Sequence, residues 1–322
     1  MVSGIKKASW RNMVKNLYVV GILIFFVVLF TIISPKFVRI ASLVNILRAA
    51  APTIMVATAV TLLMISGHVD LSVGSMLGFC GVFFAVLCKS GIPVVTAALL
   101  TTIIGGVIGI VNGLLVVKLK IIPVIATLAT MSLLLGIAKL LTGDTIPYVK
   151  GNLPKAFTYL GRGSIGGIPV QLFIIIVIIA IFVILEKRSI LGKYSIAIGG
   201  NKIAASLSGI NVNAIIWTMY ILVGIVGGFA GVVKASNLTI ADATAGAGFE
   251  LDVIIAVLLG GTSFQGGEGS VLRTVVGAFI LVILGIGMNF IGVPPFYQYV
   301  VKGVVLIVAI LLDTLVKEQI AE

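Results

Sequence analysis

The residues with the most distinctive chemistry lie in ISGHVDLSVGSMLG, residues 65–78, between two long apolar runs. The stretch holds Asp70 and the only histidine of the chain, His68. One histidine is too few for the usual zinc site with two or three histidine ligands, and it more often bonds a backbone carbonyl or lines a vestibule. Asp70 precedes Ser72 by two residues, where a carboxylate can accept the free amides of a helix beginning near Leu71. We predict an N-cap at Asp70, with a mobile gate at the inner mouth of a pathway as the alternative.

The sequence lacks the motifs of common enzymes. It has no nucleophile elbow G-x-S-x-G, no H-E-x-x-H and no phosphate-binding G-x-x-x-x-G-K-[ST]. The nearest glycine–lysine pair, in LGKYS at residues 191–195, lacks the upstream glycine and the hydroxyl after the lysine. We therefore expect no catalysis and no cofactor in this chain. If its work needs ATP, another subunit must supply the nucleotide site.

Polar residues within the apolar runs indicate a neutral pathway. The acidic residues lie almost all at helix ends or in loops, and the predicted spans are nearly free of ionisable groups, apart from Lys139 and Lys302 near their edges. Ion-driven pumps place such groups in mid-span. Asn112 and Asn289 are the most unusual residues, because an amide in hydrocarbon needs a hydrogen-bond partner. They either join helices or touch a hydroxylated solute.

A second distinctive stretch is GGNKIAASLSGINVN, residues 199–213. Its glycines and asparagine predict a short capped helix over residues 202–207. Ile203 and Leu207, four residues apart, place two apolar side chains on one face of that helix. Such a helix is typical of a docking element for a soluble partner, or alternatively lies on the membrane surface. The candidate docking residues are Gly199, Gly200, Asn201, Ala204, Ala205, Ser208 and Gly209.

The composition places these stretches in a membrane protein. The chain has 322 residues, of which 60% are hydrophobic and 10% charged, and its mean hydropathy is +1.29. An ordinary globular domain has about 25% charged residues. We attribute the net charge of +12 to lysines and arginines in cytoplasmic loops and near anionic lipid headgroups, and we expect no nucleic-acid partner.

The apolar runs predict an all-α, polytopic integral membrane protein. A helical span needs about 20 apolar residues. We expect about ten transmembrane helices, or eight if the weaker ones are re-entrant. The strong candidates are residues 17–33, 93–117, 121–141, 170–185, 214–233, 274–291 and 298–316, and the weaker ones are 49–66, 71–88 and 251–264. The basic N-terminus and first run resemble a signal peptide, but no small-residue cleavage site follows, so we expect an uncleaved span.

The distribution of lysine and arginine predicts the orientation. With both termini in the cytoplasm, the ten-span arrangement puts twelve of these residues inside and eight outside. Two longer connections stand out: residues 142–169, expected outside, and the basic residues 186–213, expected inside. Neither is long enough for a separate soluble domain, so we expect a single permease-like domain over residues 1–322.

A short internal similarity suggests two halves. ISGHVDLSVGSMLG can be set against TSFQGGEGSVLRTVVGA, residues 262–278, because Asp70 and Glu268 each stand two residues before a Ser-Val pair. We predict two weakly similar five-helix halves, residues 17–165 and 166–316, running in parallel, with a pathway at their interface.

Four stretches together resemble one family. They are SGHVDLSVGSMLG, GGNKIAASLSGINVN, TAGAGFELDVIIAVLLGGTSFQGGEGSVLRTVVGA and FYQYVVKGVVLIVAILLD. In this order, over about residues 25–313, they are similar to the permease subunit of ribose/xylose/galactose-type ABC sugar importers. One departure is visible: His68 and Val69 stand where the family commonly has glycine and isoleucine, which weakens any substrate role for these two positions.

The resemblance implies a larger machine. It implies a second permease copy or a sister permease, ABC ATPase subunits that bind ATP and Mg, and an extracytoplasmic sugar-binding protein, in the bacterial cytoplasmic (inner) membrane. Residues 199–210 would be the coupling helix in the ATPase groove, and Asp70 and Glu268 would lie near the inner gate. The outer loops, including residues 142–169 and 235–250, would dock the binding protein.

Other functions stay open at this point. Within the same family, the solute could be autoinducer-2, a nucleoside or another small polar molecule. An ATP-independent secondary transporter would carry solute without ATPase partners. An enzyme acting on lipid would need a cluster of His, Asp or Glu at one interface, which the sequence lacks.

Overall fold

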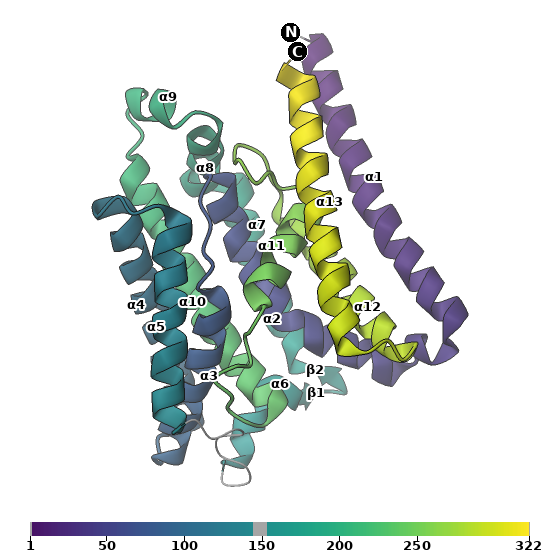
Figure 1. The fold of residues 1–322 in the computed structure, drawn as a ribbon, viewed down its shortest axis with the longest axis vertical. Helices are drawn as coiled ribbons and strands as arrows, with labels where there is room; N and C mark the ends of the chain where they lie inside the picture. The colour runs from purple at the N-terminus through teal and green to yellow at the C-terminus, as the bar shows by residue number, and fades with distance from the viewer. Residues whose placement is uncertain (1, 144–152, 322) are drawn as a thin grey trace.

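The computed structural model describes residues 2–143 and 153–321, and helices dominate this part of the chain (Figure 1). The predicted all-α class is confirmed, with one small departure: the hairpin of β1 (Ser164–Ile165) and β2 (Ile168–Pro169). The longer helices are α1 (Val2–Ile33), α2 (Ile40–Ile65), α3 (Val73–Lys89), α4 (Val94–Gly113), α5 (Pro123–Thr142), α7 (Val170–Arg188), α10 (Val212–Leu238), α12 (Val271–Phe290) and α13 (Pro295–Ala321). The shorter ones are η1 (Pro35–Val38), η2 (Leu114–Lys118), η3 (Lys155–Thr158), α6 (Tyr159–Arg162), α8 (Ile190–Gly200), α9 (Lys202–Leu207) and α11 (Phe249–Leu259).

Each of the ten predicted spans corresponds to a helix, but their lengths differ. In the described part of the chain, six helices are long and apolar enough to cross a membrane: α2, α4 with η2, α5, α7, α10 and α12. Helix α11 has 11 residues, about 16 Å at 1.5 Å per residue, which is about half of a hydrocarbon core. Helix α11 corresponds to the weaker predicted span 251–264, and it is too short to cross the membrane alone.

Helix α2 shows where hydropathy misplaced an element. The sequence predicted a weak span from residue 49, whereas the helix begins at Ile40 and is the most buried of the six spans. The prediction stopped at Arg48, because a charged residue ends an apolar run. In the structure Arg48 donates from Nη2 to the carbonyl of Arg162, 3.1 Å away. The helix therefore continues through a charged residue that has a hydrogen-bond partner on another segment.

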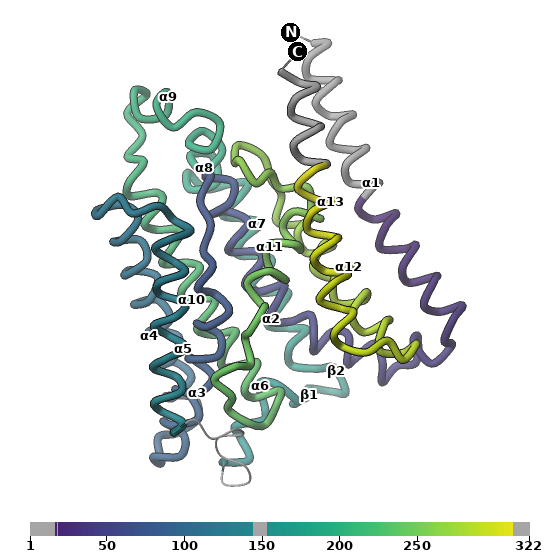
Figure 2. Tube along the Cα trace, viewed as in Figure 1, coloured from purple at the N-terminus to yellow at the C-terminus, as the bar shows by residue number. Residues whose placement is uncertain are grey.

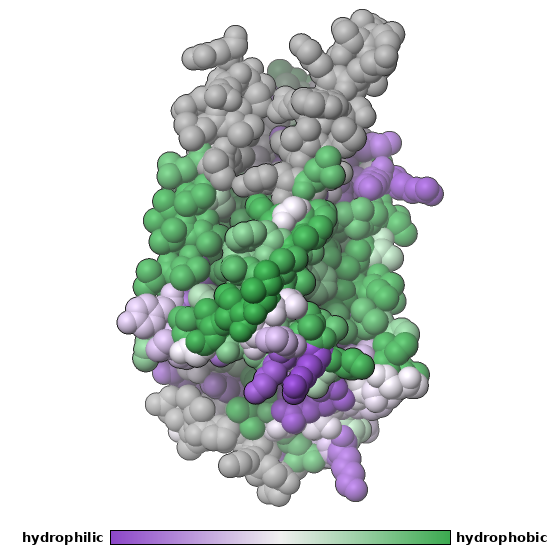
Figure 3. Space-filling model, turned by 90° about the vertical axis from the view of Figure 1, so that its right-hand side faces the viewer, coloured by the Kyte–Doolittle hydropathy of each residue, from purple (hydrophilic) through white to green (hydrophobic). Residues whose placement is uncertain are grey.

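The helices form a bundle with two distinct ends (Figure 1). Helix α1 begins and α13 ends at the end that carries α9, and the hairpin lies at the opposite end. On the side of α1 and α13, a broad hydrophobic band covers the described surface, with hydrophilic residues gathered below it (Figure 3). This distribution is that of a protein surrounded by lipid. Of the predicted outer loop 142–169, residues 144–152 lie outside the described residues.

The tightest helix pair is α4 with α10. Gly105 and Gly109 of α4 face Gly224 and Tyr220 of α10 so closely that a side-chain carbon at either α4 glycine would collide with an α10 carbonyl oxygen. Small residues of this kind let helices approach in lipid, where no hydrophobic effect drives them together. The pair therefore forms a rigid unit, and its helix α10 also packs against the buried α2.

In two places the chain turns back inside the bundle through a non-helical segment, between α2 and α3 and between α10 and α11. Helix α2 runs toward the end with α9, and after the non-helical residues 66–72 the chain turns back into α3 (Figure 2). Helix α10 runs away from that end, and after residues 239–248 the chain turns back into α11 (Figures 1 and 2). Both α3 and α11 thus begin in the interior, and their first turns meet there.

Candidate functional site

The carboxylate of Asp70 is the centre of a buried polar junction at the start of α3. Its Oδ1 accepts hydrogen bonds from the backbone amide of Ser72 at 2.8 Å and from the Ser72 hydroxyl at 2.6 Å. The predicted N-cap at Asp70 is therefore wrong by two residues, because α3 begins at Val73 with Ser72 as its N-cap, and Asp70 instead accepts the amide of that capping residue. Asp70 is 1% exposed and Ser72 is fully buried, so these bonds replace water completely.

Asn112 of α4 completes this junction. Its Nδ2 donates to Asp70 Oδ2 at 3.1 Å and to Ser72 Oγ at 2.8 Å, and its own Oδ1 is buried without a hydrogen-bond partner among the described residues. The loop is held from two further helices, because Tyr220 donates to the carbonyl of Val69 at 3.0 Å and Thr127 accepts the amide of Leu71 at 3.1 Å. The structure thus joins three of the predicted pathway residues, Asp70, Ser72 and Asn112, in one network of neutral donors around a buried carboxylate.

The same backbone-and-side-chain motif occurs before α11. Asp242 accepts the amide and the hydroxyl of Thr244, both at 2.7 Å. The two segments share the pattern D-x-[ST]-x-G, residues 70–74 and 242–246. They cross at their glycines, since a side-chain carbon on Gly74 would lie 2.6 Å from the carbonyl oxygen of Gly246.

This pairing differs from the internal similarity found in the sequence. The sequence matched Asp70 with Glu268, whereas the hydrogen-bonding pattern of Asp70 recurs at Asp242. Helices α1 and α7, which open the two expected halves, run in opposite directions (Figure 1). The boundaries 17–165 and 166–316 stay a prediction.

The remaining pathway candidates lie outside this junction. Residues 66–67 and 265–267 are neighbours, since Gly267 donates its amide to the carbonyl of Ile65 at 2.8 Å. The stretch of Glu268 thus touches the end of α2, but Glu268 is not part of the network around Asp70. Asn289 lies on α12, where it accepts a hydrogen bond from Gln298 Nε2 at 2.6 Å.

His68 lies between the junction and α9. Its Nδ1 is 2.9 Å from the carbonyl oxygen of Ser66, which is the backbone contact that the sequence anticipated for a lone histidine. It lines a cavity of about 400 Å³ together with Lys120 and Lys202. Burial lowers the pKa of His68, and the positive charge of Lys202 lowers it further, although the bond to Ser66 opposes both effects.

The short helix predicted at residues 202–207 is confirmed as α9. Asn201, with extended backbone, caps it by accepting the amide of Ala204 at 2.9 Å. Gly209 follows in the left-handed region at φ +82°, which favours glycine at a helix end. Ile203 and Leu207 are 74% and 85% exposed, so they form an apolar pair on the outer face.

One proposed docking residue faces the wrong way for direct contact. Ala205 is 5% exposed and packs into the main core, because it stands two positions from Ile203 and so faces the opposite side of the helix. The preceding Gly199 lies against the carbonyl of Ile65 and the amide of Gly267, where no side chain would fit. The end of α8 therefore links α9 to both polar stretches.

The structure also reveals an ion pair that the sequence did not predict. Lys302 pairs with Asp252, the fourth residue of α11, with Nζ 2.8 Å from Oδ2. The sequence placed Lys302 near the edge of a span, whereas it lies seven residues, about 10 Å, inside α13. The carboxylate of Asp252 in the first turn of a predicted interior helix was the one sequence signal for this ion pair. Its partner Lys302 could not be identified from the sequence, because it is 50 residues away.

Residues 42–310 match a family described as the permease component of a branched-chain amino acid transport system. The chain belongs to this permease family. It is a multi-pass membrane protein and a transport subunit rather than an enzyme.

Several curated proteins resemble this permease over most of their length. It is 39% identical to the ribose import permease protein RbsC of Bacillus subtilis (strain 168), over 89% of each chain. It is 38% identical to RbsC of Escherichia coli (strain K12), over 95% of this chain and 94% of that protein. It is 31% identical to the galactose/methyl galactoside import permease protein MglC of Escherichia coli (strain K12), over 98% of each. No solved structure matches the permease at the significance required of these relatives.

Proposed function

We propose that this permease imports a neutral monosaccharide, similar to ribose, xylose or galactose, by alternating access that separate ATPase subunits drive. The observation that carries the solute class is the similarity, along nearly the whole chain, to permeases named for ribose, galactose and L-arabinose. The network around Asp70 agrees with a neutral solute, because its donors are all uncharged.

Helix α9 is the proposed contact with the ATPase. It projects from one end of the bundle (Figure 1) and exposes Ile203 and Leu207, which a groove in a soluble partner can bury. The end of α8 touches Ile65 and Gly267, so a displacement of α9 is transmitted to the loop that holds Asp70. That loop is the proposed gate, and Glu268 borders it.

The proposed assembly assigns the two ends of the bundle to different compartments. The end with α9 and both chain termini faces the cytoplasm of a bacterium, where ATP and Mg bind to the ATPase. The end with the hairpin faces outward and receives sugar from a binding protein. A second copy of this permease, or a sister permease, completes the pathway in the inner membrane.

The test is solute uptake by proteoliposomes that hold the permease, its ATPase and its binding protein. We expect accumulation of labelled D-ribose, D-xylose or D-galactose only with ATP and a catalytically competent ATPase. Uptake that is unchanged when hydrolysis is blocked would instead indicate a secondary transporter. ATP-dependent uptake of autoinducer-2 or a nucleoside, without uptake of sugars, would replace the solute and keep the mechanism.

A further inference from the structure

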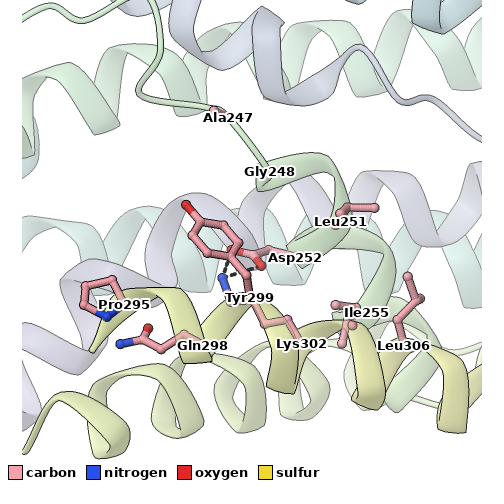
Figure 4. A pocket seen from close by; sticks show the side chains of 11 residues that line it. Ala247, Gly248, Leu251, Asp252, Ile255, Pro295, Gln298, Tyr299, Lys302 and Leu306 are labelled. Carbon is pink, nitrogen blue, oxygen red and sulfur yellow. Dashed lines mark hydrogen bonds and ion pairs between the residues drawn. The ribbon is translucent and has the colours of Figure 1, made fainter. Parts of the chain in front are cut away.

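Two adjoining cavities lie among α10, α11, α12 and α13. The first has a volume of about 300 Å³ and lies between the first turns of α11 and α13 (Figure 4). The second, of about 220 Å³, reaches α12 and Lys234 of α10. Asp252, Gln298 and Lys302 line both. The first cavity alone reaches the size at which small-molecule sites begin, about 300 Å³.

The shared lining carries three kinds of polar group. The ammonium of Lys302 lies 2.6 and 2.8 Å from the two carboxylate oxygens of Asp252, and both side chains keep about a quarter of their surface exposed. The amide of Gln298 donates to Asn289 at 2.6 Å. Charged groups at this depth in a membrane protein are expensive, and they mark solute pathways more often than packing.

The first cavity also has an aromatic wall. Tyr299 is 65% exposed and lines this cavity together with Asp252 and Lys302 (Figure 4). Gly248, in the left-handed region at φ +78°, ends the irregular segment and begins α11 there without a side chain. The cavity is thus bordered by an open helix start, a ring and an ion pair.

Resting on the proposed function, we propose that these cavities are the site where the permease binds the hydroxyl groups of its monosaccharide during passage. A pair of neighbouring hydroxyls is both donor and acceptor, which suits the opposed partners Asp252 and Lys302. Because Asp252 and Lys302 carry opposite charges, a neutral solute that displaces part of their mutual contact gives each of them a hydroxyl as a new hydrogen-bond partner. The ring of Tyr299 covers the apolar face of the sugar, and Gln298 bonds a further hydroxyl.

The experiment uses the complete importer in proteoliposomes with labelled D-ribose as the probe. The variants are Gln298→Leu and Tyr299→Ala. The matched control is Tyr297→Ala, since Tyr297 lies on the same helix and is 62% exposed but lines neither cavity. We expect initial uptake to fall about five- to tenfold in both variants, as for loss of a hydrogen bond or stacking contact, and to stay at the wild-type rate in the control.

Thermal unfolding in detergent accompanies each uptake measurement. Tyr299 is largely exposed, so Tyr299→Ala folds and decides the matter even if Gln298→Leu does not. Uptake by Tyr299→Ala equal to that of the Tyr297→Ala control would overturn the site. Failure of the wild-type importer to take up any sugar with ATP would instead overturn the proposed function, so the two failures are distinguishable.

Discussion

Asn112 makes two hydrogen bonds from one amide nitrogen, one to a buried carboxylate and one to the hydroxyl beside it. It donates to Asp70 and Ser72, residues on a different segment of the chain, and all three side chains are inaccessible or nearly so. In such a network each member depends on the others, because an unsatisfied polar group in a low-dielectric interior is costly. Single residues therefore decide whether the start of α3 is ordered.

We expect Asn112→Leu to destabilise the permease by about 1–3 kcal/mol, the cost of leaving buried polar partners unsatisfied. Thermal unfolding in detergent measures this loss. The matched control is Thr130→Val, because the buried hydroxyl of Thr130 donates only to Ala126 of its own helix. Equal melting temperatures for Asn112→Leu and the wild type would show that the network does not hold the loop.

His68 gives stability a dependence on pH. Its folded-state pKa is below the ordinary 6.5, mainly because of burial. Between pH 6.5 and the folded-state pKa, the unfolded chain therefore binds more protons at His68 than the folded chain does. The contribution of His68 to the free energy of unfolding is thus fully present above pH 6.5 and is lost as the pH falls toward the folded-state pKa. We expect the wild type to lose more stability than His68→Gln between pH 7.5 and 5.5, in denaturation series at both pH values. Since the chain has no other histidine, a parallel loss in both proteins would contradict this assignment.

At the scale of elements, two kinds of helix surface differ. Helices α4 and α10 pack closely through glycines, whereas α9 exposes apolar side chains. Gly105 faces a carbonyl of α10, whereas a side-chain carbon added at Gly136 of α5 would meet no neighbouring atom within 4 Å. Helix α9 shows the opposite design, with 85% of Leu207 exposed. Both features follow from which face of a helix a residue occupies.

Gly105→Val tests the rigid pair. We expect a loss of about 1–3 kcal/mol, since the added atoms force α4 away from α10. Gly136→Ala is the control, and it should be neutral or stabilise by up to about 1 kcal/mol, because alanine favours a helix and the site is open. Melting temperatures of the two variants in one detergent give the comparison. A Gly105→Val protein as stable as the wild type would rule out the close contact.

Leu207→Asp on α9 tests docking. We expect the variant to fold as the wild type does, since the side chain is exposed, and to bind the ATPase at least about tenfold more weakly, as for removal of an apolar anchor. Co-purification with tagged ATPase measures this. Ile168→Asp, 44% exposed on the hairpin at the other end, should bind normally. Unaltered binding by Leu207→Asp would move the contact away from α9.

At the scale of the whole molecule, the two ends of the bundle differ. Both terminal helices and α9 share one end, and the hairpin lies at the other (Figure 1). An even number of crossings, ten in the sequence prediction, returns the chain to the side from which it started. The assignment of these ends to cytoplasm and exterior is a prediction of charge asymmetry.

Introduced cysteines test that orientation. Cys80 and Cys88 are buried, so a membrane-impermeant maleimide should label mainly the new site. In intact cells with a permeable outer layer, we expect Ile168→Cys to react and Leu207→Cys to react only after the inner membrane is opened. Labelling of Leu207→Cys from outside would reverse the orientation and with it the proposed role of α9.

The sequence by itself determined what depends on neighbours along the chain. Apolar run length set the membrane class and the ten helices, and Asn201 and Gly209 set the ends of α9, because caps bond amides within the same turn. Asp70 was predicted as a cap for the same reason, and it accepts the amide of a residue two positions on, although that residue, Ser72, is the N-cap of α3.

Only the tertiary structure decided which distant groups meet. Asp70 and Asn112 are 42 residues apart, and Asp252 and Lys302 are 50 apart. Gly74 crosses Gly246, and Ala205 faces inward, because helix packing fixes which side of each element is covered. Hydropathy does not indicate which face of a helix is covered in a bundle where nearly every face is apolar. Which helices pack together is set by close contact between small residues and by the few polar groups that need hydrogen-bond partners.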